Sequence, residues 1–412
     1  MKIGGKMIGS LTGIRVLDLT RILAGPSCTQ LLGDLGAEVI KIEKPGAGDD
    51  TRKWGPPYVK NSKGQESTES AYYLSANRNK KSLAIDIAQK PGQDLIKNLA
   101  GSCDILIENF KVGDMEKYGL AYPQLSPDFP QLIYCSITGF GQNGPYAARP
   151  GYDFLAQAMG GLMSITGELN GQPMKVGVAV ADLMCGMYAA VAVLAALNHR
   201  HHHQHGQYID LGLLDTQVAW LANVGMNYLT SGQTPQRFGN EHPNIVPYTV
   251  MPCQDGHFVL AIGNDQQFQK FCQVAQCFQI SEDPRFNTNH QRVKNRSILY
   301  PLLQDITRQH PQKYWVDQLT TMGVPCSPVN NIAQVFEDPQ ILARNMKIKM
   351  DYPLSSSQEV ELIGNPIKMS ATPVTYRTAP PRLGEHTEEV LKDILNLSRS
   401  EILALRKKNI VG

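Results

Sequence analysis

The alternation of strand and helix patterns in the first 140 residues constrains the fold more than any other feature. Residues 13–20, "GIRVLDLT", alternate apolar and polar side chains and predict a strand. Gly25 and Pro26 then suit a turn into a helix that ends near Gly36, and "AEVIKIEKP" (37–45) predicts a second strand. Two strands joined through a helix pair in parallel, so this unit predicts a parallel sheet.

The same alternation continues along the chain. Further strands are predicted at 81–87, 104–110 and 131–141, with a helix at 91–103 and a long polar loop at 46–70. The chain of 412 residues exceeds one ordinary core. We therefore predict an α/β protein: a large doubly wound, Rossmann-like domain (1–225), a linker with a smaller α/β domain (226–329), and a C-terminal return to the large domain (330–412).

Composition excludes several classes of protein. The net charge of +2 gives no global field for nucleic acid. The eight cysteines include no CxxC pair and mostly adjoin apolar residues, which indicates reduced thiols rather than a disulfide framework. The first residues lack a secretory signal pattern. We expect a cytoplasmic location, or the mitochondrial matrix if the source is eukaryotic.

One carboxylate stands in an apolar run. Asp182 is the only charged residue between Lys175 and His199. The run is long enough to span a bilayer, but a central Asp costs about 2.5–3.5 kcal/mol on insertion scales, so we expect a helix inside a large protein and no membrane partner. Three interpretations of Asp182 remain open at this point: a hydrogen-bonded buried acid, a general base, or a carboxylate nucleophile.

Two apparent cofactor or metal signals are weak. Glu43 ends a strand where dinucleotide-binding proteins place an acid on the ribose, but the turn "TRILAGPS" lacks GxGxxG. The cluster His199–His205 has no accompanying Cys or acid at ligand spacing and is typical of a solvated surface. We therefore expect no metal and no tightly bound cofactor.

Cations follow several of the predicted strands. Lys44 ends one strand, Lys111 and Lys117 follow another, and "NRNKKS" (77–82) precedes a third. The carboxyl ends of parallel strands share one sheet edge, where α/β ligand sites gather. A charge run is usually only a solvated face, but this placement also suits a phosphorylated ligand.

Long motifs in the chain resemble those of the family III CoA-transferases, the group of formyl-CoA transferase and carnitine CoA-transferase. The resemblance covers nearly the whole chain. It rests on "GIRVLDLTRILAGPSCTQLLGDLGAEVIKIEKPGAGDDTR", "NRNKKS", "ILIENFKVG", "SITGFGQNGP", "GYDFLAQAMGG", "GVAVADLMCGMYA", "GVPCSPVNNIAQVFEDPQ" and "PRLGEHTEEVL".

This resemblance implies a site and an assembly. Asp182 matches the family's catalytic aspartate, which forms an aspartyl anhydride and then an aspartyl-CoA thioester. Coenzyme A is a substrate held at the positions of Ile22, Lys44, Ile85, Asn109 and Phe110, and we add Lys111 and Lys117 as cations beside them. The segment 263–268, with Gly263, Asn264 and Gln266, takes the place of a mobile glycine loop but has only one Gly. The family fold is an interlocked homodimer of ring-shaped chains.

Two further points concern the reaction. Racemases of the same fold act on 2-methylacyl-CoA and pair the acid with a His, where this chain has Tyr152, whose ordinary pKa near 10 suits proton exchange poorly. The segments "GDDTRKWGPPY", "RFGNEHPNIVPY" and "GNDQQF" look most like the succinyl-CoA:glutarate branch. Donor and acceptor would then be short dicarboxylates, with Arg21, Arg149 and Arg237 as candidate partners of the far carboxylate.

Overall fold

The computed structural model describes residues 2–3, 6–7 and 9–412. The chain divides into two compact units. The first comprises 1–161, 176–222 and 340–412, and the second comprises 162–175 and 223–339. The chain therefore enters and leaves the second unit twice.

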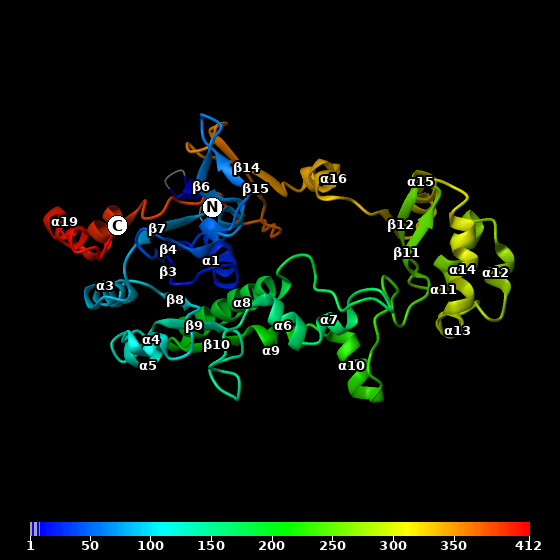
Figure 1. Ribbon diagram of the computed structural model, residues 1–412, viewed down its shortest axis with the longest axis horizontal. Coiled ribbons are helices and arrows are strands. Elements are labelled where there is room, and N and C mark those ends of the chain that lie inside the picture. Colours follow the sequence, from blue (N-terminus) through cyan, green and yellow to red (C-terminus); the bar gives the residue numbers. More distant parts are fainter. Residues whose placement is uncertain (1, 4–5, 8) are drawn as a thin grey trace. The chain divides into compact units, whose positions relative to one another are not determined.

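A six-stranded parallel sheet organises the first unit, which confirms the predicted α/β fold (Figure 1). The spatial order is β10-β9-β8-β3-β4-β7, and every neighbouring pair is parallel. The chain runs outward from β3 through β4 to β7 and then returns to β8 on the other side of β3, so the sheet has a topological switch point between β3 and β8. The strands are β3 (Arg15–Asp18), β4 (Glu38–Glu43), β7 (Lys80–Ala84), β8 (Ile105–Glu108), β9 (Ile133–Thr138) and β10 (Tyr208–Gly212).

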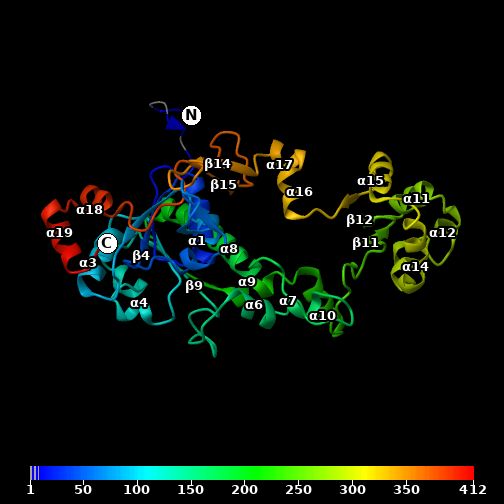
Figure 2. The ribbon, with the colours of Figure 1, turned by 45° about the horizontal axis from the view of Figure 1, so that its top comes forward.

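The two faces of this sheet carry separate hydrophobic cores, because successive strand residues point to opposite faces. Val16 belongs to the core with α1 (Ala24–Asp34) and α8 (Val180–His203), whereas Leu17 belongs to the other core. The helices that pack against the core of Leu17 form a second group, which Figure 2 shows near β4. It comprises α3 (Lys90–Ala100), α4 (Asp114–Lys117), α5 (Tyr122–Leu125), α18 (Thr387–Leu395) and α19 (Arg399–Lys407).

Shorter elements complete the first unit. The predicted loop at 46–70 is wrong in part, because it contains a short helix and an antiparallel hairpin, η1 (Asp50–Lys53), β5 (Tyr58–Lys60) and β6 (Glu66–Ser70). The buried Arg52 holds this segment through ion pairs to Glu43 and Glu69. The other elements are β1 (Lys2–Ile3), β2 (Lys6–Met7), α2 (Ala71–Ser75), α6 (Asp153–Met159), α9 (Leu213–Ala219), α17 (Pro339–Ala343), β14 (Lys347–Asp351) and β15 (Glu359–Ile363).

The second unit has its own sheet and core. Three antiparallel strands pack beneath helices around Trp315, which stacks on Phe258 and Phe271. Its strands are β11 (Tyr248–Cys253), β12 (Gly256–Ala261) and β13 (Cys326–Pro328). Its helices are α7 (Leu162–Ile165), α10 (Ala222–Ser231), α11 (Asp265–Val274), α12 (Phe278–Glu282), α13 (Asn289–Lys294), α14 (Arg296–Thr307), α15 (Gln312–Thr321) and α16 (Ile332–Glu337).

Helix α8 is apolar on all sides, and by length and composition it could cross a membrane. One face packs against α1 and the sheet through small residues. A Cβ at Gly186 would lie 2.3 Å from the Ser27 Oγ and 2.5 Å from the Ala24 carbonyl oxygen, so glycine lets the two helices approach closely. Asp182, one turn before Gly186, is thereby brought to the start of α1.

Candidate active site

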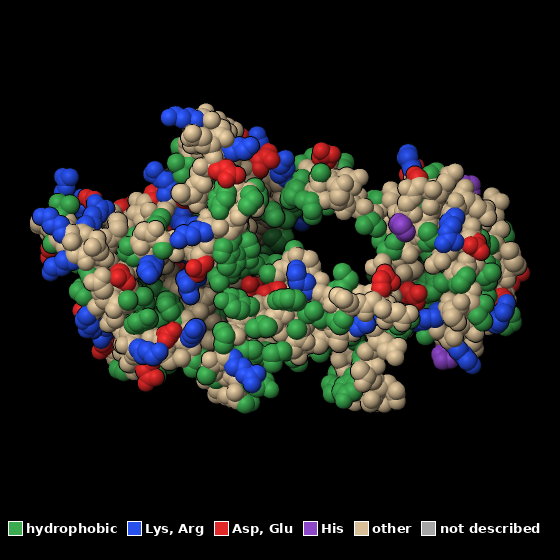
Figure 3. Space-filling view, in the orientation of Figure 1, with side chains coloured by type: hydrophobic (Ala, Val, Ile, Leu, Met, Phe, Trp, Pro, Cys, Tyr) green, Lys and Arg blue, Asp and Glu red, His purple; other side chains and the backbone are tan. Residues whose placement is uncertain are grey.

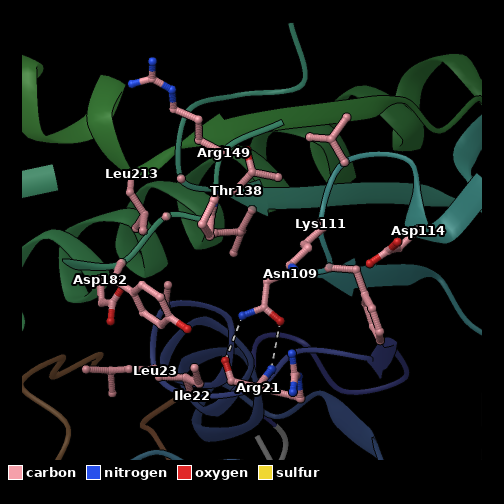
Figure 4. A pocket seen from close by; sticks show the side chains of 18 of the residues that line it. Arg21, Ile22, Leu23, Asn109, Lys111, Asp114, Thr138, Arg149, Asp182 and Leu213 are labelled. Carbon is pink, nitrogen blue, oxygen red and sulfur yellow. Dashed lines mark hydrogen bonds between the residues drawn. The ribbon is translucent and has the colours of Figure 1, made fainter. Parts of the chain in front are cut away.

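A cavity of about 210 Å³ opens in the first unit at the carboxyl ends of β3, β8 and β9. It lies at the topological switch point, where open α/β sheets bind ligands. Segments after these three strands line it, together with Asp182 from α8 and Leu213 from α9. In Figure 4 the Asp182 side chain lies between Leu213 and Leu23.

Asp182 is a buried acid without a hydrogen-bond or ion-pair partner for its carboxylate in the part of the chain that the structure describes. The residue is 8 % exposed, and burial, reinforced by the nearby charge of Asp153, raises the pKa of its carboxyl to about 7. Within residues 2–3, 6–7 and 9–412, no group donates a hydrogen bond to this carboxylate and no cation pairs with it. A buried acid with a structural role normally has such partners, so this arrangement differs from that of a satisfied core carboxylate.

The neighbouring acid Asp153, unlike Asp182, has several hydrogen-bond partners. It begins α6, and its Oδ1 accepts hydrogen bonds from the backbone N–H groups of Ala181, at 2.8 Å, and Asp182, at 3.4 Å. Its Oδ2 accepts from the Gln157 amide at 2.8 Å. Asp153 therefore caps the N-terminus of α8, and its hydrogen bonds fix the position of the residue that carries the unpartnered acid.

The loop after β3 is held from the neighbouring strand. Asn109, just beyond β8, accepts a hydrogen bond from the Arg21 backbone N–H at 2.9 Å and donates one to the Arg21 carbonyl at 2.8 Å (Figure 4). The amide of Asn109 is thus occupied by the backbone of the loop. Ile22, next in the chain, lines the cavity with φ of 72°, a conformation that β-branched residues rarely adopt.

A second cavity, of about 400 Å³, adjoins the first along the same sheet edge. Arg21, Phe110 and Asp114 line both cavities, and Lys44 and Ile85 line only the second. Four of the predicted CoA-binding residues, Ile22, Asn109, Phe110 and Lys111, therefore gather in the cavity of Asp182. Two others, Lys44 and Ile85, lie in the adjoining one, and Phe110 connects the two groups.

The cations have unequal surroundings. Lys44 is exposed, and Lys111 is exposed at the wall of the first cavity. Lys117 lines neither of these two cavities, and its Nζ lies 2.8 Å from a carboxylate oxygen of Asp114. Lys117 thus pairs with Asp114, the acid that lines both cavities, and does not itself line either of them.

The three candidate arginines also differ. Arg21 pairs with Asp50 at 2.8 Å. Arg149 lines the first cavity, but its guanidinium stacks on Tyr146 and points away from Asp182 in Figure 4. Arg237 belongs to the second unit, where it donates to the carbonyls of Glu168 and Gly171.

The predicted loop with Gly263, Asn264 and Gln266 belongs to the second unit, where Gly263 and Asn264 precede α11 but Gln266 already lies in its first turn. The Gly263 N–H donates to the Gln267 side chain at 2.7 Å, and the Asn264 side chain accepts from the Gln267 N–H at 2.9 Å. These bonds tie the loop to the first turn of the helix. A covering role over Asp182 stays a prediction.

Several cavity residues were missed from the sequence. Leu23 and Ala24 begin α1, Thr138 ends β9, and Leu213 begins α9. Thr138 follows from the rule that ligands lie at carboxyl ends of strands, so its strand boundary was a usable signal. Leu213 carries no chemical signature and depends on tertiary packing. Tyr72 does not line the cavity, but burial and the nearby charge of Asp182 raise its pKa to about 12.

Glu43 and the cluster His199–His205, the weak signals for a dinucleotide and a metal, contact other side chains of the protein. The buried Glu43 carboxylate accepts hydrogen bonds from Arg52 and Ser82. His199 and His203 stack at 4.4 Å between ring centroids near the end of α8. Within the described residues, no group of three or more His, Cys, Asp or Glu is arranged to hold a metal ion.

The model of one protein family, CoA-transferase family III, matches residues 11–387. The chain belongs to this family. The match confirms the predicted family and establishes a CoA-transferase, whose substrates are acyl-CoA thioesters and carboxylic acids.

Curated relatives of this CoA-transferase cover nearly its full length. It is 46% identical over 390 residues to "Succinate--glutarate CoA-transferase" of Agrobacterium fabrum, covering 95% of this chain and 97% of the relative. It is 42% identical over 404 residues to the human "Succinyl-CoA:glutarate CoA-transferase", covering 98% of this chain and 90% of the relative.

A solved structure agrees with the fold. A CAIB/BAIF family protein from Brucella suis superposes with a TM-score of 0.83 at 43% identity, covering 94% of this CoA-transferase and 100% of that chain. A protein from Mycobacterium tuberculosis gives a TM-score of 0.81 at 28% identity, covering 93% and 99%.

Proposed function

We propose that this CoA-transferase moves CoA from succinyl-CoA to a short dicarboxylate such as glutarate, with Asp182 as nucleophile. The observation that carries the catalytic part is the buried, unpartnered carboxylate of Asp182 in a cavity at the switch point of the sheet. A carboxylate removed from water and left without hydrogen bonds is more reactive toward a carbonyl carbon than a solvated one.

The proposed reaction proceeds through two covalent species. An Asp182 oxygen attacks the thioester carbonyl of the donor, and the C–S bond breaks. CoA leaves as a thiolate, and Asp182 and the donor acyl group are joined in a mixed anhydride. The thiolate attacks the aspartyl carbonyl and releases the donor acid, leaving an aspartyl-CoA thioester. The acceptor carboxylate attacks this thioester to form a second anhydride and releases the CoA thiolate. The thiolate then attacks the acceptor carbonyl of the anhydride and forms the product acyl-CoA. Asp182 is regenerated as a carboxylate.

The surroundings of Asp182 suit these intermediates. Anhydrides and thioesters hydrolyse, and the buried neighbours Ala181 and Cys185 and the half-buried Leu183 keep the environment of the acid apolar. The two adjoining cavities suit a long substrate with a reactive end and a charged end. We place the thioester of acyl-CoA near Asp182 and its nucleotide beside Lys44 and Ile85, with Lys111 and Lys117 as additional cations.

The substrate pair rests on the relatives named for succinate and glutarate. A dicarboxylate needs a cation for its far carboxylate, and Arg21 and Arg149 line the cavity of Asp182. A racemase is not favoured, because Tyr152 lines this cavity where the racemases of this fold place a His.

We also propose a homodimer of interlocked chains in a cytosol-like compartment. Apolar side chains gather over α6, α8 and α9 (Figure 3), and Met187 and Val191 of α8 are 54% and 63% exposed. A surface of this kind suits a partner of the same chemistry. All eight cysteines are free, which agrees with reduced thiols.

Labelling of Asp182 tests the mechanism. The wild-type enzyme, incubated with succinyl-CoA and no acceptor, should yield a hydroxamate on the peptide "VADLMCG" after hydroxylamine treatment. Asp182→Asn keeps the shape of the side chain and should lose both the label and at least three orders of magnitude in kcat. Asp153→Asn is the control for a neighbouring acid, and in it the label should stay on Asp182. A label on another acid, or substantial activity in Asp182→Asn, contradicts the mechanism.

A panel of donors and acceptors tests the substrates. Succinyl-CoA with glutarate should give the highest kcat/KM, above formyl-CoA with oxalate and above any pair with carnitine. Mass spectrometry of the CoA products identifies the transfer. A preference for a monocarboxylate acceptor would reject the dicarboxylate proposal and leave the aspartyl mechanism standing.

A further inference from the structure

We propose that Asp49 is a positioning residue for the CoA site, because its carboxylate, paired with Lys41, holds Ile22 in the left-handed conformation that shapes the loop after β3. The proposal rests on the proposed function in one respect, since it takes the cavity lined by Ile22 as the place where acyl-CoA binds. Asp49 belongs to the motif "GAGDDTR", to which that mechanism gives no role.

The strained residue identifies what has to be held. Ile22 has φ of 72°, and the conformation costs a β-branched side chain more than almost any other residue. Such a conformation persists only where surrounding contacts fix it. Both carboxylate oxygens of Asp49 accept from the Ile22 N–H, at 3.2 and 3.3 Å.

Buried groups fix the carboxylate itself. The Lys41 Nζ lies 2.9 Å from an Asp49 oxygen, and both side chains are fully buried. The Thr51 N–H and hydroxyl donate to Asp49 at 3.0 and 2.7 Å. Although burial alone raises it, the pKa of Asp49 is lowered to about 2 by Lys41 and these hydrogen bonds, so Asp49 stays ionised at neutral pH.

The same groups hold three consecutive residues of the loop. Lys41 donates to the Thr20 carbonyl at 2.8 Å, Asn109 binds both the N–H and the carbonyl of Arg21, and Asp49 binds the Ile22 N–H. The next residues, Leu23 and Ala24, line the cavity with Asp182. The loop is therefore held by the buried side chains of Lys41 on β4 and Asp49 after it, and by the half-buried Asn109 just beyond β8, rather than by its own sequence.

A matched pair of variants separates positioning from stability. Asp49→Asn keeps the side-chain shape and removes the charge. Asp34→Asn is the control for loss of a buried, paired charge, because Asp34 is also fully buried and pairs with Arg78 at the far end of α1. Asp34 lines neither cavity, whereas Asp49 lines the second, so a direct effect of Asp49 on the ligand has to be separated by the Ile22→Gly background. We expect both to lower Tm, but only Asp49→Asn to raise KM for acyl-CoA at least tenfold, with KM for the acceptor acid unchanged.

Ile22→Gly supplies the second half of the test. Glycine adopts positive φ without strain, so a loop carrying it no longer needs Asp49 to hold residue 22. In the Ile22→Gly background, Asp49→Asn should change KM for acyl-CoA less than threefold. An equal effect of Asp49→Asn in both backgrounds, or an effect no larger than that of Asp34→Asn, overturns the proposal.

A variant that removes both charges covers the case in which Asp49→Asn does not fold. Lys41→Gln/Asp49→Asn leaves no unpaired buried charge. If it folds, it should show the same increase in KM. If neither variant folds with Ile22 but both fold with Ile22→Gly, the positioning role is supported; if neither folds in either background, Asp49 is only structural and the proposal fails. The hydroxylamine label on Asp182 in the wild-type enzyme reports on the mechanism independently of all these outcomes.

Discussion

At the scale of single residues, two neighbouring acids differ in their hydrogen bonds, and this difference is the basis of the role proposed for Asp182. Asp153 and Asp182 lie close enough for the charge of one to raise the pKa of the other. Asp153 accepts three hydrogen bonds and caps a helix, whereas Asp182 accepts none from the described residues. The proposal that Asp182 is the nucleophile therefore rests on the absence of donors to it among the described residues, and not on its burial alone.

The raised pKa of Asp182 predicts a pH dependence. Attack needs the carboxylate, so kcat/KM should rise with pH and level off above about 7, the pKa that burial gives this group. The folded pKa lies above the ordinary value of 3.8, so the folded state binds more protons between these two values, and the stability from this group falls as pH rises through about 7.

Asp182→Asn should accordingly be more stable than the wild type at pH 8, by about 1–3 kcal/mol, and similar to it at pH 4. Urea unfolding at the two pH values measures the difference. Equal stability of the two proteins at pH 8 would contradict the raised pKa.

Lys44 gives a second prediction at this scale. It stands exposed in the cavity proposed for the nucleotide. Lys44→Ala should raise KM for every acyl-CoA, because the loss of one charge-assisted contact costs about 1–2 kcal/mol of binding free energy. The order of preference among acceptor acids should stay unchanged. Lys53→Ala is the control, since Lys53 is exposed and lines neither cavity. Equal KM values for the two variants would remove Lys44 from the site.

At the scale of elements, the contact between α8 and α1 determines where Asp182 lies. Gly186→Ala places a Cβ against the Ser27 hydroxyl and the Ala24 carbonyl, and the backbone carbonyl cannot yield without moving α1. We expect a loss of about 1–3 kcal/mol in stability, as for other overpacked sites, and a fall in kcat because the acid moves with α8. Gly177→Ala is the matched control, because its Cβ would meet nothing within 4 Å. Full activity of Gly186→Ala would show that the acid tolerates displacement of α8.

The strands of the parallel sheet were predictable from sequence because buried apolar runs are bounded by turn residues. β3 and β4 lie within the predicted 13–20 and 37–45. The hairpin at 58–70 was not predictable, since its polar strands are held by the buried Arg52 network. β11 was not predictable either, because Pro252 argues against a strand in the sequence; it is an edge strand, where Pro252 is tolerated.

The candidate site was predictable to a similar extent. Asp182 was conspicuous as a lone charge in an apolar run, and the strand ends pointed to Lys44 and Lys111. No local pattern indicates that Asn109 binds the backbone of Arg21, or that Asp49 binds Ile22, because these contacts join residues far apart in the chain. These contacts form only when β3, β4 and β8 lie side by side in the folded sheet.

At the scale of the whole molecule, the first unit exposes apolar side chains that suit a protein partner. Helix α8 exposes Met187, Tyr188, Val191 and Leu194 along one face while its other face is buried. The adjoining α6 exposes Phe154, Leu155 and Met159. A surface helix in a monomeric protein normally carries polar side chains on its outer face. These apolar side chains are therefore the surface on which the proposed dimer would form.

The last prediction concerns that interface. Val191→Glu would bury a charge if α8 faces a second copy of the chain, so it should lower the dimer content in light scattering. Lys392→Glu lies on α18, which packs in the core on the other face of the sheet from α8, and should leave the dimer intact. If the two chains are interlocked, wild-type dimers carrying different tags should not exchange subunits over days at neutral pH, and mixed dimers should form only after unfolding and refolding together. Rapid exchange of subunits would reject interlocking, and a monomeric wild-type protein would reject the dimer as well.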